Sequence, residues 1–396
     1  MAEKDAKTTE SKPANVGKVE VPTKAEVTKV NLAQTMKVDG LKAHTDAPAK
    51  TDSLYQTTKA SATVDKGKNS QYTVEASKTV NQINPSATVV VENTHEKEVN
   101  KKSTLSQHQK TVTSLSNMGY TEENTTNSTY QGKRVITRVN EETSTHSYAL
   151  GKAHGYSDGH NSSKRVETAH FDSKDRVRQT DYHYAHTDNN YASLNDQKTV
   201  LNADGTLKYH ASVEAQHGRS SVVNDGASLK VLDGKKSFSV DTNDDRTHYE
   251  IKKKKGKDTE EVTQLYAYKN GKVSGWQYTE KNGEYTGEHT EFSDKQTHKK
   301  IEKEQRRAAK IINKIAETEK IQSLDEYYSL LPNVTDARRA LPAGEFFKGN
   351  YQQEAGYQQA KAEMTEQNRQ EVAKKKSVSA QDVVDAKIKQ YRELKR

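Results

Sequence analysis

Residues 263–286 read TQLYAYKNGKVSGWQYTEKNGEYT, which is two successive copies of one unit. In each copy a tyrosine precedes Lys-Asn-Gly, so Tyr266 matches Tyr278 and Asn270 matches Asn282. An Asn-Gly pair between alternating apolar and polar residues is a strong β-hairpin signal, because both residues tolerate positive φ. This stretch therefore predicts short antiparallel strands joined by tight turns.

Two-residue turns at these Asn-Gly pairs would place Tyr266 opposite Gly275 and Tyr278 opposite Gly287. An aromatic ring beside a strand glycine shields bare backbone and fixes the register of the strands. We therefore expect tyrosine to cover glycine twice. A degenerate third copy continues as far as Phe292.

The aromatic, the Asn-Gly turn and the following glycine in residues 263–292 resemble MORN-type β-hairpin repeats. The resemblance covers only these residues and fades upstream of Lys257. It implies a meander that serves as a scaffold or a partner-binding surface, in some cases beside a membrane, and it implies no catalysis.

Residues 119–295 share the character of this stretch. They contain no proline, 14 of the 20 glycines, 13 of the 20 tyrosines and the single tryptophan, Trp276. Sequence that is free of proline, rich in tyrosine and interrupted by Asp-Gly and Asn-Gly pairs is typical of antiparallel strands. We predict an antiparallel β-meander here, built as a single layer or around a thin core.

Residues 1–118 contain four of the six prolines and no arginine. Their Thr, Lys, Val and Ala residues offer little apolar surface to offset the entropy of ordering. We predict a low-complexity extended arm, either a flexible tail or a segment that adds a strand to the sheet of a partner.

Residues 296–396 are helical in pattern and basic, with 21 cationic and 15 acidic residues. Ile301, Ala308, Ile312 and Ile315 form a one-sided stripe, and a second stripe ends the chain. Ser323 with Glu326 predicts the start of a short helix that stops before Pro332, and Ser379 with Asp382 predicts the start of the last one. We expect each stripe to be covered by another helix, by self-association or by a partner.

The overall composition limits the class of protein. The chain has 31% hydrophobic residues, a net charge of +8 and no cysteine, whereas ordinary globular domains are roughly 45–50% apolar. It therefore cannot fill several large cores, and disulfides and thiolate metal sites are excluded. No apolar run suggests a signal peptide or a membrane span.

Catalysis and metal binding find little support. The GYSDG motif around Ser157 matches a hydrolase nucleophile elbow, but the apolar strand and the helix that an elbow needs are missing from its flanks. A hydrolase using Ser157 is the weakest alternative. Ten histidines lie in residues 119–295, and we interpret them as solvated strand residues rather than ligands of a metal. We predict no catalytic residue, no cofactor and no metal.

The candidate interaction residues are aromatic, cationic or part of the last helical stripe. Their clusters suggest strand surfaces, contacts to polyanions and helix docking. They are Tyr266, Tyr268, Trp276, Tyr278, Lys252, Lys253, Lys254, Lys255, Arg306, Arg307, Lys374, Lys375, Lys376, Val384, Ile388 and Tyr391.

Two classes of function remain open from the sequence. The favoured one is a structural, scaffold or assembly protein that associates with itself or with other assembly proteins, such as a virion component in the cytoplasm or a bacterial surface or matrix protein after removal of a signal. The alternative is a protein that binds polyanions, nucleic acid or anionic membranes through its basic C-terminal helices, with a steep salt dependence.

Overall fold

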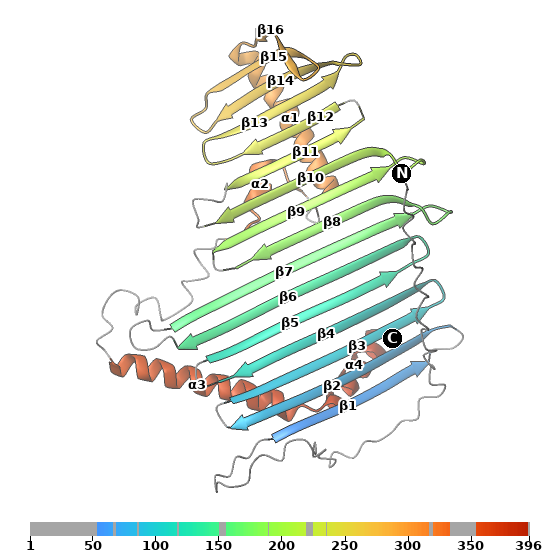
Figure 1. Ribbon diagram of the computed structural model, residues 1–396, viewed down its shortest axis with the longest axis vertical. Coiled ribbons are helices and arrows are strands. Elements are labelled where there is room, and N and C mark those ends of the chain that lie inside the picture. The colour runs from blue at the N-terminus through green and yellow to red at the C-terminus, as the bar shows by residue number, and fades with distance from the viewer. Residues whose placement is uncertain are drawn as a thin grey trace, which may run out of the picture.

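The computed structural model describes residues 54–65, 69–84, 87–116, 119–149, 156–188, 190–218, 225–234, 236–316, 320–332 and 354–394. Its main feature is one 16-stranded antiparallel sheet in which every strand pairs only with its neighbours in sequence. Figure 1 shows these strands as a ladder from β1 to β16. The strands are β1 (Leu54–Asp65), β2 (Gln71–Asn84), β3 (Ala87–Asn100), β4 (Ser103–Leu115), β5 (Gly119–Gln131), β6 (Val135–Ala149), β7 (Tyr156–Phe171), β8 (Val177–Thr187), β9 (Tyr191–Leu201), β10 (Leu207–Gly218), β11 (Gly226–Asp233), β12 (Lys236–Thr242), β13 (Arg246–Lys254), β14 (Thr259–Tyr268), β15 (Val273–Lys281) and β16 (Glu284–Glu291).

The antiparallel meander is confirmed, but it begins much earlier than residue 119. Strands β1 to β4 lie inside residues 1–118, the segment expected to form an arm, and residues 1–53, 66–68, 85–86 and 117–118 of that arm lie outside the described residues. These strands have the composition of a polar tail because one of their faces is exposed. Their Thr and Val residues alternate between that face and a face covered by helices, as the burial of β2 shows.

The two Asn-Gly turns differ from each other. Asn282 and Gly283 both have positive φ and close a two-residue turn, as expected. At the first turn only Gly271 has positive φ, and the Tyr268 N–H donates to the carbonyl of Lys272 at 2.9 Å. That bond encloses a three-residue loop with a glycine bulge, which shifts the register of the following strand.

The expected pairing of tyrosine with glycine is therefore wrong. Tyr266 faces Ser274, while Gly275 faces Leu265. Tyr278 faces His289, because a second irregularity, between Tyr278 and Glu280, shifts β16 along β15.

In the described ranges, four helices accompany the sheet, namely α1 (Asp294–Ile315), α2 (Leu324–Tyr328), α3 (Glu354–Ser377) and α4 (Ala380–Leu394). The expected caps are present. The Ser323 side chain accepts the N–H of Glu326 at the start of α2, and Ser379 and Asp382 bond reciprocally at the start of α4. In Figure 1, α1 and α2 lie behind the upper strands, α4 lies behind the lower ones, and α3 runs in from beyond the left ends of the lower strands.

All four helices cover the same face of the sheet. Residues opposite one another in an antiparallel pair point to the same side, so the register can be followed across the strands. One such row runs from Val74 in β2 to Val213 in β10, through Glu96, Gln107, Ser128, Val139, Val166, His183 and Asp196. Val74 is buried under α4, and Val213 is buried in the core beneath α1 and α2. We call this side the helix face and the other side the open face.

The helix face carries two main cores. The larger one joins apolar residues of β10 to β14 to Ile301, Ala308 and Ile312 of α1 and to Tyr327 of α2. The smaller one joins β2 to α4, and a minor cluster sets Val372 of α3 against β2, β3 and β4. The helical stripes therefore cover the sheet rather than one another. Between the cores, strands β5 to β8 present mainly half-exposed polar side chains on this face.

Gly275 allows helix α1 to pack closely on β15. A Cβ at this position would lie 2.8 Å from Cδ2 of Leu265 and 3.2 Å from Cγ2 of Thr297, a buried residue in the first turn of α1. A methyl group would therefore push the start of α1 away from β15. The absence of a side chain allows close approach of a helix, and it does not mark a site covered by tyrosine.

We expect Gly275→Ala to lower the free energy of unfolding by about 1–3 kcal/mol, the usual cost of overpacking. Urea unfolding followed by the fluorescence of Trp276, the single tryptophan, measures this change. Ser274→Ala is the matched control, since Ser274 is a half-exposed neighbour on the open face. Equal stability of both variants and the wild-type protein would contradict the role given to Gly275.

Candidate polyanion-binding groove

Helix α1 has two chemically different sides. Thr297, Ile301, Glu304, Ala308 and Ile312 are buried against the sheet. The flank beside them carries a cation in nearly every turn, and its members are Lys299, Lys300, Lys303, Arg306, Arg307, Lys310 and Lys314. With 3.6 residues and about 5.4 Å per turn, these cations form a row along about four turns of the helix.

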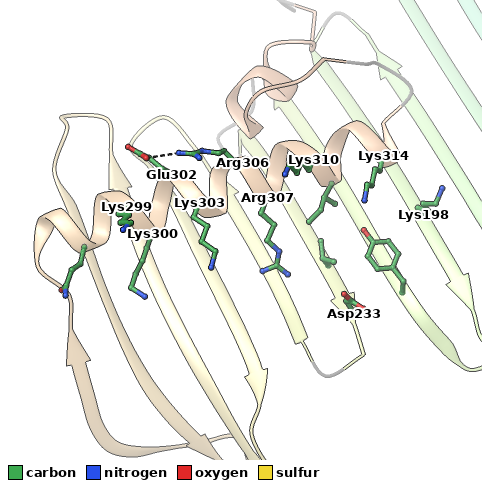
Figure 2. Close-up of a pocket in the computed structure, with 14 residues that line it drawn as sticks. Lys198, Asp233, Lys299, Lys300, Glu302, Lys303, Arg306, Arg307, Lys310 and Lys314 are labelled. Atoms are coloured by element: carbon green, nitrogen blue, oxygen red, sulfur yellow. Dashed lines mark hydrogen bonds and ion pairs between the residues drawn. The ribbon is translucent and has the colours of Figure 1, made fainter.

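A groove of about 1260 Å³ follows this row. Its other wall consists of residues on the helix face of β9, β10 and β11, namely Lys198, Tyr209, Val231 and Asp233. Of the described residues, eight cationic and two acidic side chains line it. Figure 2 shows Lys303 and Arg307 reaching from α1 over the strands, and Lys198 at the same end of the groove as Lys314.

Three of these cations have acidic partners. Arg306 pairs with Glu302 at 3.2 Å, and Arg307 pairs with Glu304 at 3.4 Å. Lys198 pairs with Asp181 of β8 at 3.3 Å. Arg307 also lies 4.3 Å from the ring centre of Phe238, which fixes its guanidinium over the sheet.

Within the part of the chain that the structure describes, the lysines of the row have no such partners. Lys299, Lys303, Lys310 and Lys314 are exposed, and no ion pair joins any of them to another residue in the described part of the chain. Lys300 is half-buried and lies 4.3 Å from the ring centre of Phe292. The groove therefore concentrates positive charge that the described residues do not neutralise, which favours an anionic ligand.

The floor of the groove is partly apolar. Tyr209 is half-buried there, and its burial, together with the nearby carboxylate of Asp233, raises the pKa of its phenol above the ordinary value, although Arg307 opposes the shift. The Tyr209 hydroxyl thus stays protonated near neutral pH and can donate a hydrogen bond. Val231 and Ile311 complete the apolar lining.

Of the predicted interaction residues, only Arg306 and Arg307 line this groove. The four consecutive lysines lie at the end of β13, where three of them have partners. Lys252 pairs with Glu280 at 3.4 Å, while Lys253 and Lys255 pair with Glu261 at 3.9 and 3.1 Å. Lys254 is exposed. Three of the four lysines thus have acidic partners within the sheet.

The lysines at the end of α3 attach that helix to the sheet. Lys375 donates to Glu122 of β5 at 2.7 Å, and Lys376 donates to Gln82 of β2, while Lys374 is exposed. Burial of Glu122 opposes its ionisation, but bonds from Lys375, Asn124 and Tyr120 outweigh that effect and lower the pKa of its carboxyl. Lys375 and Lys376 therefore serve docking of the helix.

The predicted aromatic residues form a ladder on the open face of β13 to β15. Tyr266 stacks on His248 at 4.4 Å and on Trp276 at 5.3 Å between ring centres, and Tyr268 stacks on it at 6.4 Å. Tyr278 meets Tyr285 edge to face at 5.4 Å. Because these rings cover each other's faces, they stabilise the strand pairs and leave little aromatic surface for a flat ligand.

Val384, Ile388 and Tyr391 are buried in the core between α4 and β2, and Tyr391 stacks on Tyr72 at 4.0 Å. Ser157 lies within β7 opposite Tyr148, and the strand continues to Phe171, so a helix does not follow it. Among the described residues, no group of three or more His, Asp or Glu residues is placed to hold a metal ion.

Sequence reasoning missed most of the groove. Lys303, Lys310 and Lys314 stand alone in the sequence and attract no attention as a cluster. The signal that could have found them is the helical phase, because residues spaced by three or four positions share a side of α1. Lys198 and Tyr209 belong to the wall only through the fold.

Comparison with known proteins found no protein similar to this chain. No family model matches the chain, and no curated protein or solved structure is similar to it. Among the described residues, no helix has both the length and the apolar character needed to cross a membrane.

Proposed function

We propose that this protein is a non-enzymatic scaffold that holds a linear polyanion in the groove along α1. The observation that carries the proposal is the row of lysines without described acidic partners, Lys299, Lys303, Lys310 and Lys314, on one flank of a helix fixed to a rigid sheet. Fixed cations bind a polyanion largely through the release of its counterions, and this contribution weakens as salt rises.

The shape of the groove favours one extended chain. The cations repeat about every 5.4 Å along a straight helix, so a ligand that follows them must carry its charges in a line. The sheet wall formed by Lys198, Tyr209 and Val231 closes the second side, and a broad, flat membrane surface would not enter between the walls. Single-stranded nucleic acid and inorganic polyphosphate both present phosphates in a line.

Binding of a labelled oligothymidylate to the full chain, measured by fluorescence anisotropy over a salt series, tests the proposal. Four phosphate contacts on a single strand predict a slope of about −3 in the plot of log K against log salt. Replacing Lys303 and Lys310 by Glu should weaken binding at least about tenfold and reduce the slope by about 1.4. Polyphosphate should compete, whereas vesicles containing phosphatidylserine should not.

The matched control replaces Lys374 and Lys389 by Glu. Both lysines are exposed, one on α3 and one on α4, so the double variant has the same net charge as the groove variant. We expect it to bind like the wild-type protein. Equal weakening by both double variants, or binding that ignores salt, would show that the groove is not the site.

A second candidate function, assembly through protein contacts, is favoured by the open face. Within the described ranges no helix packs on this side of any of the sixteen strands. The MORN-type resemblance of residues 263–292 implies the same role, since such meanders serve as scaffolds. A partner seated on this face would protect exposed residues of the face, such as Lys230, Ser61 and Thr63, in a footprinting experiment with hydroxyl radicals.

A further inference from the structure

The sheet is open, so it has two edge strands. Strand β1 pairs only with β2, and β16 pairs only with β15, among the residues that the structure describes. The outer side of an edge strand carries a row of N–H and C=O groups without strand partners, which can pair with another strand. Proteins usually protect such edges with charges, proline, bulges or a covering segment.

The two edges differ in this protection. Strand β16 has a register break opposite β15, positive φ at Gly287 and three glutamates within eight residues, Glu284, Glu288 and Glu291. Strand β1 is regular over all 12 residues and contains neither proline nor glycine. Its only charged residues are Lys59 and Asp65. The edge at β1 is therefore long, regular and weakly charged.

The cover on the helix face is also incomplete at this edge. Helix α4 packs on both β1 and β2, but Ala60, Ala62 and Val64 of β1 remain only half-buried beneath it, as does Val383 of α4. The corresponding residues of β2, such as Val74, are buried. Apolar surface is thus left exposed where the sheet ends.

We propose that β1 pairs antiparallel with β1 of a second copy of this chain, which joins two sheets into one around a twofold axis. Such an axis keeps the helix faces of both copies on the same side, so both α4 helices lie over the joined strands. Facing residues must then share a side, which restricts the register to steps of two residues. This pairing would bury the half-exposed alanines of both copies.

The length and the charges of β1 together favour one register. Centring the pair on Ala62 would face Lys59 with Asp65 but pair only residues 59–65, whereas centring on Ala60 pairs residues 55–65. Centring the pair on Ala60 places Lys59 opposite Ser61 of the second copy. The same register sets Thr57 opposite Thr63, and on the helix face it sets Ala60 opposite Ala60 and Ala62 opposite Thr58. A shift of the centre to Lys59 would bring two lysines face to face, and directly opposed like charges destabilise a strand pair. A second copy therefore fits this edge without a charge conflict.

The first test changes charges on the open face of β1. The dimer dissociation constant of the full chain is measured by analytical ultracentrifugation. Ser61→Lys places a lysine opposite Lys59 twice in the dimer, and we expect about tenfold weaker association. Adding Lys59→Glu should restore the dimer, because each glutamate then faces a lysine. Thr290→Lys at the β16 edge is the control and should leave association unchanged.

A second test uses the absence of cysteine from the chain. Proteins carrying Thr57→Cys and Thr63→Cys should form a disulfide-linked pair when mixed under oxidising conditions, whereas each alone should form much less. Both positions are exposed on the open face. A monomeric full chain, or a dimer that Ser61→Lys does not weaken, would overturn the proposal. If the full chain is a monomer and its β1 amides are protected from hydrogen exchange, residues 1–53 rather than a second copy would be the pairing partner of β1.

Discussion

Tyr327→Ala is expected to lower the free energy of unfolding of the larger core by about 3–5 kcal/mol, the usual cost of truncating a buried aromatic residue. Tyr327 is completely buried, although α2 contains only five residues. Its hydroxyl donates to Oδ2 of Asp196 at 2.6 Å, and Oδ1 of Asp196 lies 2.7 Å from Nδ1 of His183. Burial and this carboxylate raise the pKa of the Tyr327 phenol, which keeps it a donor.

Tyr327→Phe separates the ring from the hydroxyl. The ring still fills its cavity, but Asp196, which is 1% exposed, loses one hydrogen bond. Leaving a buried acceptor without that partner costs about 1–3 kcal/mol, so we expect the Phe variant to fall between the Ala variant and the wild-type protein. Urea unfolding followed by Trp276 fluorescence gives this order. Tyr285→Ala, at a residue that is 52% exposed, is the control. Equal losses in the Phe and Ala variants would contradict the assigned roles.

Val384→Asp is expected to release α4 from the sheet. Val384 is completely buried between α4 and β2, and a carboxylate placed there would have an apolar environment. Burying such a group without a partner costs more than about 2 kcal/mol, so undocking of the helix is the cheaper outcome. Hydrogen exchange should then become fast in α4 and faster in β1 and β2.

The larger core should not respond to Val384→Asp. Its residues lie on β10 to β14 and on α1 and α2, and the polar strands β5 to β8 separate these strands from α4. Exchange in β11 to β14 and the unfolding monitored by Trp276 are therefore expected to match those of the wild-type protein. Lys389→Asp, at an exposed position of α4, is the control for the added charge. Loss of both cores in Val384→Asp would show that they unfold as one unit.

The sequence predicts the strand and helix types well where local signals exist. The Asn282–Gly283 turn, the caps at Ser323 and Ser379 and the burial of Val384 all follow from short-range patterns. Strands β1 to β4 were missed because their burial comes from helices some 250 or more residues later in the chain, as shown by the bond from Lys376 to Gln82 of β2. A low apolar content is typical of disorder, but it is also sufficient for a sheet with one covered face.

The candidate site was harder to predict, because charge clusters in sequence do not report where charges lie in space. The run Lys252–Lys255 is conspicuous, yet three of its four lysines pair with Glu261 of β14 or Glu280 of β15. The scattered lysines of α1 become a row only when the helix forms. The packing of its apolar stripe on the sheet then places them beside the strands. Strand register had the same limitation, since one glycine bulge at Gly271 changed the partner of Tyr266.

The mainly polar strands β5 to β8 fix the distance between the two ends of the sheet. Neighbouring strands are about 4.8 Å apart, so the steps from β2 to β10 set a spacing of about 38 Å between the edge-proximal helix and the groove. Because the chain is a meander, gain or loss of one hairpin would change this spacing by about 9.6 Å and leave chain direction and face unchanged. The distance between α4 and the groove can thus change in steps of one hairpin, while the structures of α4 and of the groove stay the same.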